Sequence, residues 1–545
     1  MVSVFTECGT GSAQGWARKQ GENAQLLLKQ VVRMYQLAMT APVDQLYIPS
    51  DEPHPFIEGI FAPVPEIGDK VRIEVVEGQI PKDFPPGCYI RNGPNPRYGT
   101  RQNLHSPLLG GKTFYNWFEG EGMLHATYIE EDGSIWYKNK YVETESFKLE
   151  TEMGRKVYLP TFDERSTPGA RFNRMFNIVK PNYDTGNMAV FEHAGNVVVT
   201  NEGSKAYEID ISDLSTKGEY NCNGNWNRRF FGPHPKTHPD TNQLLVYGFD
   251  IGKPYYVVSL LSGDGKQLVN KVDLGLERLI LMHDVGITDK YIIVYDFPLV
   301  MDVFNMLLKG EPMISFDCSG ESRIGVLPFM GDQSSIKWFS VNRACLSHHC
   351  NSYEDGDEII VHGVVTCKLL PTDPDADPFE WYARGMTLQC QDECEVENSS
   401  IDGKLFGHVH EWRLNLRTGE VNERNLSGDK CAIEMPRINE NYTGKKYRYI
   451  YAGSEDIEAS KAKGNFISPE HVFVARPGAT EEDDGWIVTY VYNESTSMSD
   501  MIIIDAQNFD KEPVARLRLP QIVPYGFHGA YIYKRDDRPS SVQLL

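Results

Sequence analysis

The chain has 545 residues, of which 41% are hydrophobic and 24% are charged, so it can bury a large core and lacks the composition of a disordered protein. Its formal net charge of -22 at pH 7 argues against binding to a nucleic-acid backbone, which requires clustered lysines and arginines. We therefore expect a globular protein without a nucleic-acid partner.

The first predicted element is a helix in the N-terminal segment 1–50. The stretch from Glu22 to Leu46 has apolar residues at helical spacing between Leu27 and Ala38. Lys29 and Arg33 lie within it and argue against a transmembrane span. The pattern predicts an amphipathic helix, which could pack on the protein's own core or form a peripheral membrane-contact patch.

The same N-terminal segment bears on where the protein is found. It has no positively charged region leading into a long apolar core, so it is not a secretory signal, and it is too short and too acidic for a transit peptide. The ten cysteines are scattered without zinc-ribbon spacing, which favours reduced thiols. We expect a cytoplasmic protein, peripheral to a membrane if the patch forms, and leave a plastid location open.

One pattern recurs between residues 126 and 519: a strand with alternating apolar residues, a polar turn and a second strand. Its five imperfect copies begin at Ala126, Ala206, Tyr255, His410 and Met501. A radially repeated all-β body explains them better than several domains, because no Pro/Gly/Ser-rich linker interrupts the series. We predict a β-propeller that forms one domain over residues 51–545.

A second apolar stretch breaks the β pattern between Phe297 and Leu308. It is short and is followed by Lys309. Such a segment more often packs on its own core. Together with the N-terminal helix it could also form a patch that dips into a membrane surface.

Histidines stand in or beside four strand-like runs, "GPHPKTHP", "LILMHDVGIT", "LSHHCNSYEDGDEIIVHG" and "VPYGFHGAYI". A buried histidine needs a hydrogen bond, a proton to move or a metal, and each of these alone is typical of a structural histidine. In a propeller, however, the inner strands all face one axis, so distant imidazoles can meet there and form a metal site. Glu202, Glu434 and Glu470 recur in apolar strand contexts, where they could orient such ligands or be surface charges.

Eight segments of the chain resemble the signature segments of the carotenoid cleavage oxygenases. They are "FPPGCYIRNGPNPRYG", "YNWFEGEGMLHATY", "GPHPK", "MHDVGIT", "HHCNSYEDGDE", "MPRINENYTGKKYRYIYAG", "ARPGATEEDDGWIV" and "VPYGFHGAYI". They come in family order and cover the chain from about residue 70 to its end. The resemblance implies an all-β, seven-bladed β-propeller, with short helical segments capping one non-haem Fe(II) held on the axis by four histidines.

The resemblance also implies which residues serve the iron. The four ligands it implies are His234, His283, His348 and His528. His238 is a bystander because the family ligand precedes Pro-Lys, and His349 is one because the ligand lies three residues before an asparagine. Carboxylates that match the family's orienting residues are Glu202, Glu434 and Glu470, which we expect to hold His283, His348 and His528 in some pairing.

The chain departs from the family at three positions near these motifs. Asn201 stands where many members carry a threonine that crowds the metal, Ser347 replaces a common phenylalanine, and Tyr353 replaces a common tryptophan. These changes bear on substrate choice and on the open coordination position. The residues that we name as candidates for a substrate tunnel are Asn201, Trp338, Phe339, Ser347 and Phe527, and the aromatic ones could equally belong to the core.

The resemblance implies a dioxygenase that uses Fe(II), one per chain, and O2 to split a conjugated C=C bond of a carotenoid or apocarotenoid into two carbonyl products. Four neutral imidazoles leave the ion its full charge and without the carboxylate of facial-triad oxygenases. One alternative keeps the iron and cleaves a phenolic stilbene or phenylpropanoid. Another is a non-enzymatic propeller that binds partners. The sequence indicates no particular oligomeric state.

Overall fold

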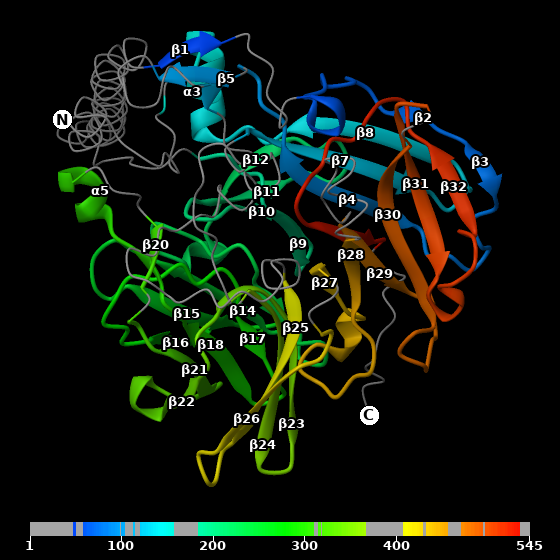
Figure 1. The fold of residues 1–545 in the computed structure, drawn as a ribbon. Helices are drawn as coiled ribbons and strands as arrows, with labels where there is room; N and C mark the ends of the chain where they lie inside the picture. Colours follow the sequence, from blue (N-terminus) through cyan, green and yellow to red (C-terminus); the bar gives the residue numbers. More distant parts are fainter. Residues whose placement is uncertain are drawn as a thin grey trace, which may run out of the picture.

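The computed structural model describes residues 47–50, 58–98, 100–103, 113–114, 120–156, 158, 184–309, 314–317, 319–366, 407–428, 432–455, 470–493 and 496–534. The helix predicted between Glu22 and Leu46 lies outside these residues. In the described part of the chain, strands dominate and gather into sheets around a common axis (Figure 1).

Seven sheets form the blades of a β-propeller, numbered here in the order of their inner strands from the C-terminal strand onward. Blade 1 consists of β33 (Gly529–Tyr533), β4 (Gly87–Pro94), β7 (Gly122–Ile129), β8 (Ile135–Tyr141) and β2 (Val71–Arg72). Blade 2 consists of β9 (Ala189–His193), β10 (Asn196–Thr200), β11 (Ala206–Ile209) and β12 (Thr216–Tyr220). Blade 3 consists of β13 (Lys236–Thr237), β14 (Leu244–Phe249), β15 (Tyr256–Leu261) and β16 (Leu268–Asp273).

The other four blades follow in chain order. Blade 4 consists of β17 (Gly286–Ile287), β18 (Tyr291–Asp296), β21 (Ser322–Pro328) and β22 (Lys337–Val341). Blade 5 consists of β23 (Cys345–Asp355), β24 (Glu358–Thr366), β25 (His408–Asn415) and β26 (Val421–Asn425). Within the described residues, blade 6 has β27 (Ala432–Arg437) and β28 (Tyr451–Glu455), and blade 7 consists of β29 (His471–Ala475), β30 (Gly485–Asn493), β31 (Met498–Asp505), β32 (Ala515–Arg518) and β3 (Val75–Gly78).

Strands from both ends of the chain close the ring. The C-terminal β33 pairs antiparallel with β4 in blade 1, and the N-terminal β3 pairs antiparallel with β32 in blade 7. Figure 1 shows both contacts as blue strands beside red or orange ones. The inner strands β27, β29, β33 and β9 contact one another in sequence around the axis. The prediction of a propeller is therefore confirmed.

All five predicted hairpins are present, and each is a pair of adjacent strands in one blade. They are β7–β8, β11–β12, β15–β16, β25–β26 and β31–β32, all antiparallel. Alternating apolar residues form these strands because one face of each packs against the next blade. The central strands are buried along their whole length, as in β14 and β15, and their side chains form the clusters between blades.

The helices in the described residues are short and lie in connections between strands. Helix α3 (Glu145–Met153) follows β8; the Thr144 hydroxyl accepts from the Phe147 N–H at its start, and Gly154 ends it at a φ of 65°. Helix α5 (Val303–Lys309) falls within the predicted apolar stretch, between β19 (Leu299–Met301) and β20 (Ile314–Phe316). A further sheet joins β1 (Tyr47–Ser50), β5 (Thr100–Asn103) and β6 (Thr113–Phe114). Among the described residues, no helix has the length and apolar character needed to cross a membrane.

Candidate metal centre

Each of the seven blades contributes one polar residue to a cluster on the axis. In blade order they are His528, Glu202, His234, His283, His348, Glu434 and Glu470. His348 lies in β23 and Glu434 lies in β27, whereas the others stand within three residues of a strand end. Inner strands converge on one axis, so side chains separated by up to 326 positions meet there.

The four imidazoles face one another at the centre of this cluster. The His234 and His283 Nε2 atoms are 3.0 Å apart, and the His348 and His528 Nε2 atoms are 3.1 Å apart. Neighbouring rings cross at steep angles, from 71° between His283 and His348 to 84° between His234 and His528. One potential ligand atom from each of the four lies within 4.8 Å of all the others.

Three of the imidazoles are held by carboxylates at Nδ1. The His283 Nδ1–H donates to Glu202, in a very short contact, and the His348 Nδ1–H donates to Glu434 Oε2 at 3.0 Å. The His528 Nδ1 lies 3.5 Å from Glu470 Oε1. A carboxylate can only accept, so each Nδ1 carries the proton and each Nε2 lone pair faces the centre. That tautomer is the one that binds a metal through Nε2.

The surroundings keep two of these imidazoles neutral. Burial lowers the pKa of His234 well below its usual value, and the other three imidazoles lower it further. Burial likewise lowers the pKa of His528 to about 4, although Glu470 opposes this. For His283, burial would lower the pKa, but Glu202 more than offsets this and the pKa is raised. A histidine must be neutral to coordinate a metal, so His234 and His528 are in the protonation state that coordination requires.

The donor set fits an octahedral-type metal ion with open positions. Two ligand atoms at a right angle, each about 2.1 Å from an ion, lie about 3 Å apart, which matches the two Nε2 pairs. Imidazole suits Fe, Zn, Cu and Ni better than Mg or Ca. Four imidazoles leave room on an octahedral ion for further small ligands. The residues present therefore fit Fe(II).

His349 lies outside the cluster although it follows His348 directly. Its Nδ1 is 2.7 Å from the Tyr295 hydroxyl, and its ring packs so closely on Gly286 that a Cβ there would overlap it. Successive strand residues point to opposite faces, which separates the two histidines.

His238 also lies outside the four-histidine cluster. It stands near two carboxylates, those of Asp240 and Asp289. Its Nδ1 accepts from the backbone N–H of Asp240 at 3.2 Å, which leaves the proton on Nε2, 3.8 Å from Asp289 Oδ1. Lys445 Nζ lies 2.7 Å from Asp240 Oδ1 and neutralises it. With Nδ1 accepting a backbone N–H and Nε2 carrying the proton, His238 has no free lone pair to offer a metal ion in this arrangement.

The candidate tunnel residues fall into two groups. Asn201, Ser347 and Phe527 each adjoin a residue of the axial cluster, and Asn201 Nδ2 donates to Ser204 Oγ at 3.1 Å. Trp338 and Phe339 lie on β22, the outer strand of blade 4. The Trp338 ring packs under Arg323, 4.4 Å from its guanidinium carbon, and Phe339 belongs to a core cluster. This outer placement favours core packing for both.

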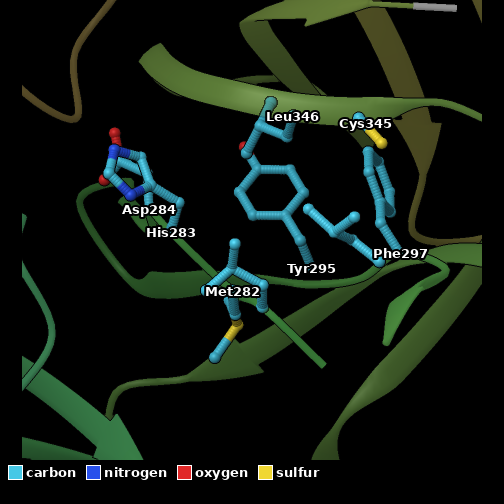
Figure 2. Close-up of a pocket in the computed structure, with 9 residues that line it drawn as sticks. Met282, His283, Asp284, Tyr295, Phe297, Cys345 and Leu346 are labelled. Carbon is cyan, nitrogen blue, oxygen red and sulfur yellow. The ribbon is translucent and has the colours of Figure 1, made fainter. Parts of the chain in front are cut away.

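A pocket adjoins His283 on the blade 4 and blade 5 side of the cluster (Figure 2). Its lining residues are Leu281, Met282, His283, Asp284, Tyr295, Phe297, Leu299, Cys345 and Leu346. Most are apolar, and the polar exceptions include His283 and Asp284 at one end, to the left in Figure 2. None of the apolar residues was among the sequence-derived tunnel candidates.

Sequence reasoning also missed three charged residues that support the axial cluster from outside the four imidazoles. Lys236, Asp284 and Arg437 all lie inside the quoted motifs "GPHPK", "MHDVGIT" and "MPRINENYTGKKYRYIYAG". Arg437 donates to Glu470 Oε1 and to the Gly529 carbonyl oxygen, the latter at 2.7 Å. The available signal was a charged residue within three positions of a candidate ligand or orienting carboxylate, as for Lys236 after His234, Asp284 after His283 and Arg437 after Glu434.

Comparisons with known proteins find similar sequences and a similar fold. The family model described as "Retinal pigment epithelial membrane protein" matches residues 61–533. The carotenoid 9,10(9',10')-cleavage dioxygenase 1 of Pisum sativum is 30% identical over 536 residues, covering 90% of this chain and 92% of that protein. The structure of Pseudomonas brassicacearum lignostilbene dioxygenase superposes with a TM-score of 0.71 at 21% identity, covering 88% of this chain and 99% of that one. Cobalt-substituted Synechocystis ACO gives a TM-score of 0.68 at 22% identity, covering 85% and 96%.

Proposed function

The chain belongs to the retinal pigment epithelial membrane protein family, that of the carotenoid cleavage oxygenases, and on this premise we propose that it is a non-haem Fe(II) dioxygenase. It uses O2 to cleave a conjugated C=C bond of a carotenoid or apocarotenoid. Both oxygen atoms end in the products, one in each new carbonyl group. The overall reaction therefore needs no external reductant.

One observation carries this proposal: four imidazoles with their Nε2 atoms at the axis, three of them with a carboxylate at Nδ1. We propose that His234, His283, His348 and His528 hold one Fe(II) per chain. Glu202, Glu434 and Glu470 orient the last three rings and raise their basicity. Four histidines with that support would serve no purpose in a propeller that only binds partners.

A bound Fe(II) supplies the site that activates O2. The chain's own residues do the positioning. The neutral imidazoles leave the ion its full charge, and no side chain in the cluster is required to act as a general acid or base. The apolar side chains of Met282, Phe297, Leu299 and Leu346 beside His283 are the kind of lining that a hydrocarbon substrate contacts.

The test is to purify the chain, measure iron per protein and incubate it with 18O2. A carotenoid or apocarotenoid should yield two carbonyl products, each carrying one labelled oxygen, and the reaction should stop without O2. A parallel panel of phenolic stilbenes tests the other substrate class. Cleavage of stilbenes alone would replace the carotenoid in this proposal, and a chain without bound iron or cleavage activity would favour the non-enzymatic propeller.

A further inference from the structure

His234 differs from the other three histidines of the cluster. Among the described residues, carboxylates lie at the Nδ1 atoms of His283, His348 and His528, but none lies within ion-pair distance of His234. A ligand without a carboxylate must be placed by other contacts, because a metal site tolerates little error in ligand position. Two sets of contacts near the backbone of His234 hold this residue in position.

The first contact is the hydroxyl of Tyr247. It accepts from the His234 backbone N–H at 3.3 Å and donates to the carbonyl oxygen of His283. Tyr247 is 1% exposed, and its ring packs against Gly232, where any Cβ would overlap it. One fixed hydroxyl therefore joins the backbones of two histidines of the cluster.

The second contact is a buried ion pair between Lys236 and Asp284. Lys236 lies two residues after His234, and its Nζ is 2.8 Å from Asp284 Oδ1. The other oxygen of Asp284 accepts the backbone N–H of His349 at 2.9 Å. Asp284 itself follows His283, so a single carboxylate joins the segments that carry three of the four histidines.

In this ion pair the charge of Lys236 and the charge of Asp284 compensate each other. The Asp284 side chain is 2% exposed and the Lys236 side chain 18%. Removing one member of such a pair leaves an uncompensated buried charge, whereas replacing both members removes that cost.

We propose that Lys236 and Asp284, together with Tyr247, are positioning residues for His234, and that they set how tightly and in what geometry the four histidines hold a divalent metal ion. This inference rests on the proposed function, since it assumes that the four histidines bind a metal. In the described part of the chain, they give His234 the support that a carboxylate gives each of the other three.

The test uses the full chain loaded with Co(II), whose visible spectrum reports ligand geometry. Affinity is measured by competition with a chelator, and stability of the metal-free protein by urea unfolding. Asp284→Asn should weaken Co(II) binding by about 10 to 100-fold and change the spectrum, as loss of a ligand-supporting group does. It should also destabilise the metal-free protein, because Lys236 is left unpaired.

The double variant Asp284→Asn/Lys236→Met separates positioning from stability. It should regain much of the lost stability, because no charge is left unpaired, and yet keep the weaker binding and altered spectrum. The matched control is Asp500→Asn, a fully buried carboxylate paired with Arg518 on blade 7, which should lose stability and keep parental Co(II) binding.

Three outcomes would overturn the inference. The first is that Asp284→Asn binds Co(II) as tightly as Asp500→Asn does, and the second is that the double variant regains parental affinity together with stability. Either result, with a parent that binds one ion per chain, leaves the proposed function intact. A parent that binds no ion overturns both.

Discussion

At the residue scale, β23 presents two adjacent histidines to different surroundings. His348 Nε2 faces His528, whereas His349 Nδ1 meets the hydroxyl of Tyr295. The difference follows from strand alternation and not from chemistry, because both side chains are largely buried imidazoles, 9% and 7% exposed. Position along the strand thus decides which imidazole can serve a metal.

We expect His348→Ala to abolish bound iron and activity, because it removes one of the four donors. His349→Ala should keep one iron per chain but lose about 1 to 3 kcal/mol of stability, because Tyr295 loses a buried partner. Iron analysis and urea unfolding of both variants check this. Loss of iron from His349→Ala alone would show that the assigned register of this motif is wrong.

Glu470 both orients His528 and pairs with Arg437, so its replacement should affect metal binding and stability. Its Oε1 accepts from Arg437 and from the Gly529 backbone N–H at 3.2 Å, and His528 lies next to it. Glu470→Gln should cost roughly 10 to 100-fold in iron affinity or turnover. It should also cost about 3 kcal/mol of stability, because the charge of Arg437 is then unpaired.

The control for this prediction is Glu481→Gln, an exposed carboxylate in the turn before β30. It should match the parent in iron content, turnover and stability. Equal and negligible effects of the two substitutions would mean that Glu470 does not orient His528.

His125 gives the protein a pH dependence that is independent of the metal centre. Burial lowers its pKa well below the usual value, and Arg91 lowers it further, so it stays neutral in the fold beside the Tyr137 hydroxyl, 2.7 Å away. The unfolded chain takes up this proton near pH 6.5, so stability falls as the pH drops below that value, by about 1.4 kcal/mol per pH unit.

Urea unfolding of metal-free protein at pH 7.5 and 5.5 measures this effect. Between these two values, His125→Gln should lose about 1.4 kcal/mol less stability than the parent does, because its side chain cannot take up the proton. If parent and variant lost the same stability, His125 would take up a proton in the folded state as readily as in the unfolded chain.

At the element scale, an irregularity in β27 lets two of its residues contact the axial cluster. Glu434 and Arg437 are three positions apart, so a regular strand would direct them to opposite faces. The register of β27 against β28 shifts between these two residues, and Met435 has a φ of 53°. Glu434 can then reach His348 while Arg437 reaches Glu470. A two-stranded blade thereby supports two histidines of the cluster.

Helix α5 carries the apolar surface on which a membrane contact can be tested. Phe304 and Leu308 are 69% and 71% exposed and lie one helical turn apart, and thus on one face. We predict that Phe304→Ser/Leu308→Ser weakens binding to liposomes and raises the apparent KM for a carotenoid in liposomes, because apolar area for peripheral insertion is lost. With substrate in detergent, KM should not change.

Met330→Ser is the matched control, since Met330 is 72% exposed in a turn after β21. Its liposome binding, and its apparent KM with substrate in liposomes or in detergent, should equal those of the parent. An unchanged KM of the α5 variant in liposomes would remove α5 from the membrane contact and favour a substrate that does not come from a membrane. The N-terminal helix between Glu22 and Leu46 remains a prediction.

At the scale of the whole molecule, we expect the cluster to form only when the ring is closed. The backbone of His528 is held by two distant partners, since its N–H donates to the Met188 carbonyl at 3.0 Å and its carbonyl accepts the Asn92 N–H at 3.1 Å. Strand β33 follows immediately and pairs with β4. The fourth histidine therefore reaches the axis through the closing strand.

A chain that ends at His528 tests this dependence. It keeps all four histidines and all three glutamates of the cluster but lacks β33. We expect it to bind no stoichiometric iron and to unfold at lower urea concentration, because blade 1 loses its inner strand. A chain that ends at Lys534 keeps β33 and should retain its iron. Parental iron content in the shorter chain would separate the metal centre from ring closure.

The sequence by itself determined the hairpins and, through its motifs, the family. Blades 1, 2, 3, 5 and 7 were visible as five hairpins because alternation and polar turns are local properties of a strand pair. Blade 4 was not predicted from the sequence because β19, α5 and β20 separate β18 from β21. Blade 6 was not predicted because its two described strands, β27 and β28, are separated by a long connection. The candidate histidines and glutamates came from motif resemblance, and the structure brings all seven to one axis.

Only the tertiary structure decided which groups meet. It paired Glu202 with His283 across an intervening blade, joined Lys236 to Asp284, and placed Trp338 and Phe339 on the outer strand of blade 4. Periodicity along a chain reports which face of its own strand a side chain occupies. It does not report which other strand that face meets, because in this protein the ring is closed by strands from opposite ends of the chain.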